Sequence, residues 1–223
     1  MAAIDLSAPD SVTIRPLTLA DRDACVVVEN ACFSNPDHRA TPEKFSYRLT
    51  VCPELCLGIF VHTADAEALV GPASAPQSPT AASSGIMVGH IIATRCQSSV
   101  VTDASMVLPP NWRAAVLDPA SVPASDPASA LGHQPEGSTV AVHSLGIVPS
   151  VQGRSLGTKL MKAYLERMAA LSSGQDGQHK IDRVALICQD YLVDYYTKLG
   201  FTNNGPSAAQ FGGGGWFDMY HPI

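Results

Sequence analysis

The chain has 223 residues, of which 14 are basic and 20 acidic, for a formal net charge of -6. This length fits one domain with insertions, because domains commonly run to ~100–200 residues. The acidic balance argues against a nucleic-acid-binding protein, which would carry a basic patch. No run of ~20 apolar residues could span a membrane. We therefore expect neither a nucleic-acid nor a membrane partner, whereas a cationic substrate is compatible with the charge.

The N-terminal segment has no apolar core of the kind found in secretory signal peptides. The six cysteines lie mostly in apolar stretches, which favours small buried side chains in a reducing compartment. Cys52 and Cys56 have no matching pair at zinc-ligand spacing. The sequence therefore predicts a cytoplasmic protein without a metal. It leaves the oligomeric state unresolved, with a monomer slightly favoured.

The first elements are predicted from alternation and capping. Apolar alternation predicts a strand at Val12–Arg15. Thr18 and Asp21 resemble a capping box, and the helix that they start is expected to run to about Phe33. A second, shorter helix is expected over Thr41–Thr50, since it begins with an N-cap threonine followed by a proline at the first helical position.

Two apolar strands are expected next, at Leu55–His62 and Ile86–Arg95. We expect them to pair as a hairpin across the segment that separates them. Residues 64–84 and 97–137 are rich in Ala, Ser and Pro and show little periodicity. We interpret both as loop insertions, partly disordered. A few larger apolar side chains in the second insertion are candidates for docking onto the core or a substrate mouth: Met106, Val107, Leu108 and Trp112.

The C-terminal half has the clearest pattern. A strand at Thr139–Val148 precedes a helix at Ser155–Leu171, whose apolar residues recur every three or four positions. A buried strand at Arg183–Cys188, a helix at Asp190–Leu199 and two last strands, Phe201–Asn203 and Trp216–Tyr220, follow. Strand–helix alternation implies some parallel pairing. The expected fold is α/β (α+β), a single domain over residues 1–223 with one mixed, twisted sheet of about seven strands and about four helices.

A strand-to-helix junction carries the most informative residues. Small side chains at Gly153, Ser155, Gly157 and Thr158 let the backbone approach a ligand, and the free N–H groups of a helix start can bind a pyrophosphate. An ordinary strand–helix junction is the alternative. The pattern is neither a Walker loop nor a G-x-G-x-x-G fingerprint.

The spacing Gln152-x-x-Ser155-x-Gly157 resembles the Q/R-x-x-G-x-G/A motif of the GCN5-related N-acetyltransferases, the GNAT superfamily. The segment Y-x-K-x-G-F that begins at Tyr196 resembles a second signature of that family. Within it, C-P-E-L-x-L-G after Val51 and C-x-D-x-L-V-x-x-Y after Ile187 are similar to the arylalkylamine (serotonin) N-acetyltransferase branch. The resemblance covers residues 12–62, 86–96 and 139–221. Ser155 departs from the family's glycine, and we expect it to fit with a negative φ.

The resemblance implies a GNAT fold, acetyl-CoA as cosubstrate and direct acetyl transfer in a ternary complex. It implies a catalytic base at His143 and a catalytic acid at Tyr196, with Tyr195 as a competing neighbour. A core histidine is the alternative for His143. The family has two histidines in this strand that carry protons away from the amine, and the first of them is replaced by Ala141. Either His143 then works alone through water, or another group such as Asp or Glu supplies the proton path. A strand bulge near Leu145 is expected to free backbone N–H groups for the oxyanion.

The resemblance also assigns the binding residues. Those for the cofactor are Leu145, Gly146, Ile147, Gln152, Gly153, Arg154, Ser155, Leu156, Gly157, Thr158 and Tyr196. Those for an apolar acceptor pocket are Phe33, Pro53, Leu55, Val142 and Ile187, of which Phe33 and Leu55 could equally be core.

The acceptor that the resemblance implies is a small arylalkylamine of the serotonin, tryptamine or phenethylamine type. A polyamine such as spermine or spermidine is the first alternative, favoured by the negative charge. A peptide or lysine acceptor and a non-catalytic acetyl-CoA-binding module are further alternatives. Ala141 and Ser155 favour the binding module, whereas retention of both His143 and Tyr196 argues against it.

Overall fold

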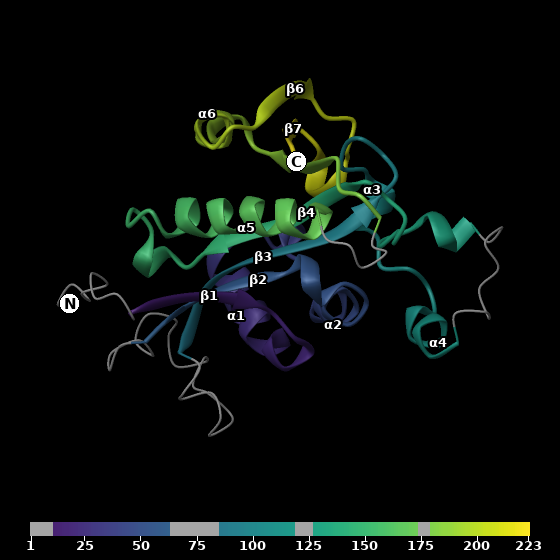
Figure 1. Cartoon of the computed structure of the whole chain (residues 1–223), viewed down its shortest axis with the longest axis horizontal. Helices are drawn as coiled ribbons and strands as arrows, with labels where there is room; N and C mark the ends of the chain where they lie inside the picture. The colour runs from purple at the N-terminus through teal and green to yellow at the C-terminus, as the bar shows by residue number, and fades with distance from the viewer. Residues whose placement is uncertain (1–10, 63–84, 119–126, 174–178) are drawn as a thin grey trace.

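The computed structural model of the chain describes residues 11–62, 85–118, 127–173 and 179–223 (Figure 1). Seven strands form one sheet in the order β1-β2-β3-β4-β5-β7-β6. All neighbouring pairs are antiparallel except β4 and β5, which are parallel. The predicted mixed sheet is therefore confirmed. Its strands are β1 Val12–Pro16, β2 Leu57–Val61, β3 Ile86–Cys96, β4 Thr139–Ile147, β5 Arg183–Cys188, β6 Thr202–Pro206 and β7 Phe217–Pro222.

Helices cover both faces of this sheet. Figure 1 shows α1 (Arg22–Cys32) and α2 (Pro42–Val51) on one face and α5 (Leu156–Ser173) on the other. A short α6 (Val193–Lys198) packs beside β6 and β7. The start of α2 follows its predicted cap, because the side chain of Thr41 accepts a hydrogen bond from the backbone N–H of Lys44.

The second insertion contains structure that the sequence did not predict. Within residues 97–137 the chain forms α3 (Asp103–Met106) and α4 (Trp112–Leu117), so the expectation of loops alone was wrong there. Met106 and Trp112 are buried, as the docking hypothesis required, whereas Val107 is exposed. Residues 119–126, and the first insertion at 64–84, lie outside the described residues.

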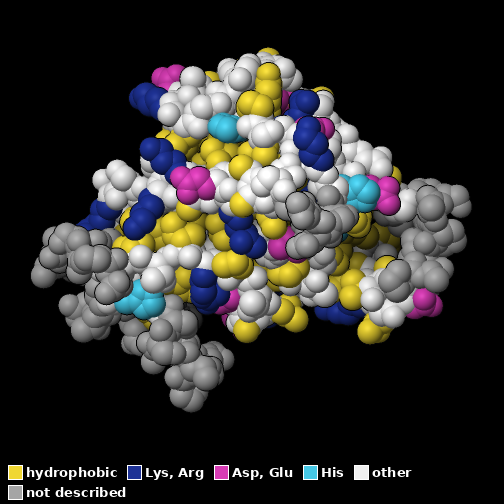
Figure 2. All heavy atoms as spheres, in the orientation of Figure 1, with side chains coloured by type: hydrophobic (Ala, Val, Ile, Leu, Met, Phe, Trp, Pro, Cys, Tyr) yellow, Lys and Arg dark blue, Asp and Glu magenta, His cyan; other side chains and the backbone are white. Residues whose placement is uncertain are grey.

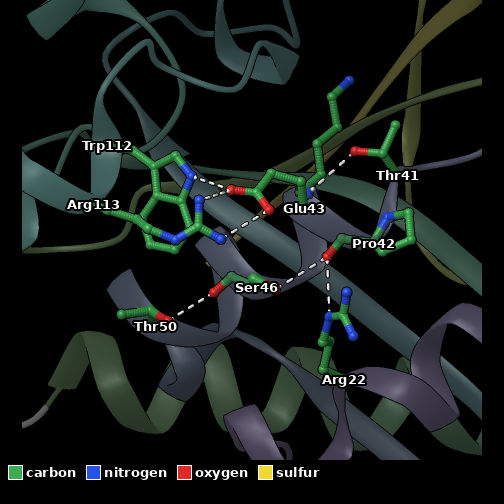
Figure 3. Close-up of polar contacts among 9 residues, drawn as sticks. Arg22, Thr41, Pro42, Glu43, Ser46, Thr50, Trp112 and Arg113 are labelled. Carbon is green, nitrogen blue, oxygen red and sulfur yellow. Dashed lines mark hydrogen bonds and ion pairs between the residues drawn. The ribbon is translucent and has the colours of Figure 1, made fainter.

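Contacts with α2 hold α4 in place. Glu43 accepts a hydrogen bond of 2.9 Å from the indole N–H of Trp112 and forms an ion pair with Arg113 (Figure 3). The ring of Trp112 also packs edge-on against Tyr47. Long-range contacts rather than local pattern therefore order this insertion.

The core has two parts. The larger cluster lies between the sheet and helices α1, α2 and α5 and includes Phe45, Ile91, Tyr164 and Met168. The smaller cluster joins the insertion to the sheet and consists of Cys96, Val101, Met106, Ala141, Ala185 and Ala209. It places the insertion on the same side of the sheet as Ala141.

On the face shown in Figure 2, basic and acidic side chains are interspersed rather than gathered by sign. In the described part of the chain, no helix combines the length and the apolar character needed to cross a membrane.

Candidate active site

A cleft of about 640 Å³ opens where β4 and β5 separate. The parallel pairing runs from Thr139–Arg183 to Val142–Leu186, and the following residues of β4 have no partner on β5. The last part of β4, the start of α5 and the helix α6 form the walls. The lining residues are Cys32, Phe33, Leu145, Gly146, Ile147, Val151, Gln152, Gly153, Ser155, Leu156, Gly157, Thr158, Tyr191, Leu192, Tyr195 and Tyr196. All the predicted cofactor residues except Arg154 are among them.

The loop before α5 is shaped for close approach of a ligand. Gln152 donates a side-chain hydrogen bond of 2.8 Å to the carbonyl of Ile147, which ties the loop to the end of β4. Gly153 has a φ of +75°, and a Cβ there would meet nothing within 4 Å, so its backbone is open on that side. The first N–H groups of the 18-residue α5 lack carbonyl partners within the helix and can bind an anion.

Ser155 does not have the negative φ that we expected. Its φ is +59°, in the left-handed region. The side chain is thus tolerated in a conformation that favours glycine and that costs other residues about 1–2 kcal/mol. The glycine of the family motif therefore has a conformational reason at this position, and the serine is strained.

We expect Ser155→Gly to raise the free energy of unfolding by about 1 kcal/mol, because it removes that strain. Urea denaturation of the full chain would measure it. Asn111→Gly is the matched control, since Asn111 also has a positive φ, of 57°, but asparagine tolerates this region well, so its gain should be smaller. Destabilisation by Ser155→Gly would contradict the strain argument.

A bulge in β4 lies at His143. Ile92 of β3 pairs with Ser144 and the next residue, Ala93, pairs with Val142, so His143 is the extra residue. The expected bulge is therefore present two residues before Leu145. As a result, the side chains of His143 and Ser144, although adjacent in the strand, both point to the face of the sheet that is covered by α1 and α2. Ser144 donates a hydrogen bond to Glu29 on α1, and His143 pairs with Thr94 on β3.

The surroundings of His143 favour its neutral form. Burial, followed by the nearby charges of Arg48 and Lys44, lowers the pKa of the imidazole well below its usual value of 6.5. The Nε2 atom lies 2.8 Å from the hydroxyl oxygen of Thr94, and Nδ1 is buried without a hydrogen-bond partner. When Nε2 carries the proton and donates it to Thr94, Nδ1 keeps a lone pair and can accept a proton. His143 itself does not line the cleft.

A buried polar network behind the bulge was missed from the sequence. The Nε2 atom of His90 lies 3.1 Å from Oε2 of Glu29 and 3.0 Å from the hydroxyl of Ser144. The other oxygen of Glu29 accepts a hydrogen bond of 2.7 Å from the N–H of Ala40. Burial alone would raise the pKa of Glu29, but the bonds from His90, Ala40 and Ser144 bring it below its usual value. A Glu and a His inside apolar segments were the signal that could have revealed the network.

We expect Glu29→Ala to cost about 3 kcal/mol of unfolding free energy, because buried partners lose their acceptor. Because the folded-state pKa of Glu29 lies below its unfolded value of 4.5, the carboxylate contributes fully above that pH. Its contribution is lost as the pH falls through the folded-state pKa. Urea denaturation at pH 7 and at lower pH should therefore show a shrinking difference from the wild type. The exposed Glu166→Ala on α5 is the control and should change stability by less than about 0.5 kcal/mol.

The two adjacent tyrosines of α6 have different surroundings, although both line the cleft. The hydroxyl of Tyr195 is hydrogen-bonded to Thr158 and would lie 3.0 Å from a Cβ at Gly157. Tyr196 is 6% exposed, packs edge-on against Phe201, and its hydroxyl has no hydrogen-bond partner among the described residues. Burial, then the neighbouring Tyr195, raises the pKa of Tyr196, so it is protonated at neutral pH. Of these two tyrosines, Tyr196 is thus the one whose hydroxyl has no hydrogen-bond partner among the described residues.

The predicted acceptor residues do not all come together. Phe33 lines the cleft, and Ile187 packs against the smaller cluster beside Ala141. Leu55 and Val142 belong to the larger core, and the hydroxyl of Tyr164 on α5 donates to the carbonyl of Leu55. Neither Leu55 nor Val142 lines the cleft, and nor does Pro53, at the start of a short 3-10 turn.

The position of the missing histidine is apolar. Ala141 is fully buried in the cluster that contains Met106 of α3. Among the described residues, no group of three His, Cys, Asp or Glu side chains could hold a metal ion.

Comparisons with known proteins agree with this geometry. Residues 126–220 match the model of the acetyltransferase (GNAT) domain. Serotonin N-acetyltransferase of Mesocricetus auratus is 24% identical over 192 residues, which cover 86% of this chain and 64% of that protein. The alignment thus spans a little under two thirds of this curated relative.

Solved structures share the fold. The loading GNATL domain of CurA from Lyngbya majuscula superposes with a TM-score of 0.60 at 12% identity, covering 96% of this chain and 98% of that one. The NatC complex bound to Gag peptide and CoA gives a TM-score of 0.56 at 13% identity, covering 96% and 99%. The matched residues, which make up less than half of the chain, include the part of β4 that separates from β5 and the helix start beside it. This part of the chain is thus similar to a GNAT acetyltransferase domain.

Proposed function

We propose that this protein is an acetyl-CoA-dependent N-acetyltransferase that transfers acetyl directly to the primary amine of a small arylalkylamine. The observation that carries the proposal is one cleft that combines an unpaired edge of β4, the N-terminus of α5 and the free hydroxyl of Tyr196.

The cleft fits acetyl-CoA in shape and in chemistry. The N–H groups at the start of α5, with the open backbone of Gly153, would bind the pyrophosphate. The backbone of Leu145, Gly146 and Ile147, which has no partner on β5, would pair with the amides of the pantetheine arm. The cosubstrate supplies the thioester whose carbonyl carbon is attacked.

Two side chains then divide the proton transfers. His143, held neutral by burial, takes a proton from the ammonium form of the acceptor, directly or through water. The freed amine nitrogen forms a bond to the acetyl carbon, the carbon–sulfur bond breaks, and the thiolate leaves. Tyr196 donates its proton to that thiolate, and the second proton that the nitrogen loses on becoming an amide returns to the tyrosinate through water. Backbone N–H groups beside the bulge at His143 are suited to the transient oxyanion.

Apolar residues support an aryl acceptor. Phe33 lines the cleft, and Ile187 lies with Ala141 and Met106 on the neighbouring face. Apolar contact of this kind suits an aromatic ring better than a chain of ammonium groups. The similarity to a serotonin N-acetyltransferase points the same way.

The test is acetyl-CoA turnover by the full chain, with the product identified by mass. The acceptors are tryptamine, serotonin, phenethylamine, spermidine, spermine and a lysine peptide. We expect kcat/KM for the aryl amines to exceed that for the polyamines by about tenfold or more. Preference for spermine would overturn the aryl assignment. Binding of CoA without turnover of any amine would overturn the enzymatic proposal in favour of a binding module.

A further inference from the structure

Two basic side chains of α2 face the candidate base. Lys44 and Arg48 are four residues apart, which places them on one side of the helix. Arg48 is 4% exposed and Lys44 is half-buried. Both charges act on His143 and lower its pKa after the effect of burial. Geometry places Arg48 in the same region, because it binds the carbonyl of Met106, and Met106 packs in one cluster with Ala141, two residues before His143 on β4. Helix α2 lies on the face of the sheet opposite α5 (Figure 1).

In the part of the chain that the structure describes, neither cation has an anionic partner. The guanidinium of Arg48 makes one hydrogen bond, from Nη2 to the carbonyl of Met106 at a long 3.4 Å. The ammonium of Lys44 lies 5.4 Å from the centre of the Phe211 ring. Within the described ranges, no carboxylate lies within 4.0 Å of either group. A buried guanidinium is costly unless it is paired and hydrogen-bonded, so this site lacks an anion.

Most of the acids on the surrounding elements already have partners. Figure 3 shows the carboxylate of Glu43, the residue before Lys44, turned to Trp112 and Arg113 of α4. Glu29 acts on Arg48 electrostatically, but its oxygens bind His90, Ser144 and the N–H of Ala40.

The remaining acids of this region are Asp103 on α3 and Asp37 before α2. Asp103 accepts from the backbone N–H groups of Gln210 and Phe211. Asp37 is exposed and makes no ion pair among the described residues. No carboxylate among the described residues therefore pairs with Lys44 or Arg48, which leaves a bound ligand as a source of the anion.

We propose that Lys44 and Arg48 bind a carboxylate of the acceptor, so that the preferred acceptor is a primary amine that also carries a carboxylate. This inference rests on the proposed function, because it places the acceptor beside His143. The phosphates of CoA do not account for the missing anion, since their proposed site is the start of α5, on the other face of the sheet. Guanidinium and ammonium groups suit a carboxylate, and they repel the additional ammonium groups of a polyamine.

The test uses pairs of acceptors that differ only in the carboxylate: tryptophan with tryptamine, phenylalanine with phenethylamine, and 5-aminovalerate with pentylamine. The third pair sets the carboxylate farther from the amine. Acetyl-CoA turnover by the full chain is measured for each, with products identified by mass. We expect kcat/KM for the carboxylate member to be higher by about tenfold or more in at least one pair, as a charge-assisted hydrogen bond would give.

Variants tie that preference to the two cations. Lys44→Met and Arg48→Met keep the length of the side chain and remove its charge, and each should cut the carboxylate preference by about tenfold, mainly through KM. Lys44→Arg should retain the preference. Lys162→Met, on exposed α5 surface, removes one lysine from the other face and should leave it unchanged.

Each outcome separates this inference from the proposed function. Turnover of the amines with no carboxylate preference in any pair would overturn the inference and leave the acetyltransferase intact. A preference that survives both methionine variants would overturn the role of Lys44 and Arg48. If no acceptor is turned over, binding of the products decides. N-acetyltryptophan binding no more tightly than N-acetyltryptamine to the CoA-loaded chain, by calorimetry, would overturn the anion site independently of catalysis.

Discussion

Tyr196→Phe is expected to lower kcat about 100-fold, the lower end of what a positioned general acid contributes. The KM for acetyl-CoA should change by less than about threefold, because the ring still fills its place against Phe201. The hydroxyl has no hydrogen-bond partner among the described residues, so its loss leaves no protein group without a partner. Steady-state kinetics with mass detection of the acetylated amine would measure both constants.

Tyr195→Phe is the matched control, one residue away on the same helix. It removes the hydrogen bond to Thr158 at the start of α5, so we expect a rise of a few fold in the KM for acetyl-CoA, roughly the value of one hydrogen bond. Its kcat should stay near that of the wild type. An equal loss of kcat in both variants, or a larger loss in Tyr195→Phe, would contradict the assignment of the acid to Tyr196.

Local sequence signals were sufficient for the regular elements of the fold. The cap formed by Thr41 and Pro42 lies at the start of α2, as predicted. The apolar stripe of α5 is buried at Leu160, Tyr164 and Met168. These features depend on neighbours within one or two turns, so the printed sequence contains the necessary information. Helix α5 runs two residues beyond the predicted end, within the usual uncertainty of helix termini.

The order of the second insertion could not be predicted in the same way. Its composition is typical of loops, and its helices α3 and α4 have only four and six residues. Such short helices are not stable alone. They depend on Met106 entering the smaller cluster and on Trp112 and Arg113 reaching Glu43, about 70 positions earlier in the chain. Contacts across that separation leave no local pattern.

In the candidate site, too, features set by nearby residues could be predicted, whereas features set by distant residues could not. The motif around Gln152 and Gly157 predicted the cleft wall, because spacing within one loop fixes that geometry. The sign of φ at Ser155 was not predictable, since it depends on how the hydrogen bond from Gln152 to Ile147 directs the loop. The partners of Glu29, and the lack of an acidic partner for Arg48 among the described residues, depend on elements brought together only by the fold.

His143→Gln is expected to lower kcat by about 100- to 1,000-fold, because the glutamine amide does not accept a proton in neutral water and the amine must then be deprotonated unaided.

The dependence of kcat on pH tests whether His143 is the base. Since burial and the charges of Arg48 and Lys44 hold the pKa of His143 well below 6.5, the imidazole is a free base at neutral pH. The wild-type kcat at saturating amine should therefore stay level as the pH is lowered through 6.5, and fall only at lower pH as the ring gains a proton. The variant should lose this acid limb, whereas His62→Gln, at an exposed histidine that pairs with Thr13, should keep both rate and profile. A wild-type midpoint at or above 6.5 would contradict a buried base beside two cations, and an unchanged kcat in His143→Gln would move the proton path to another group.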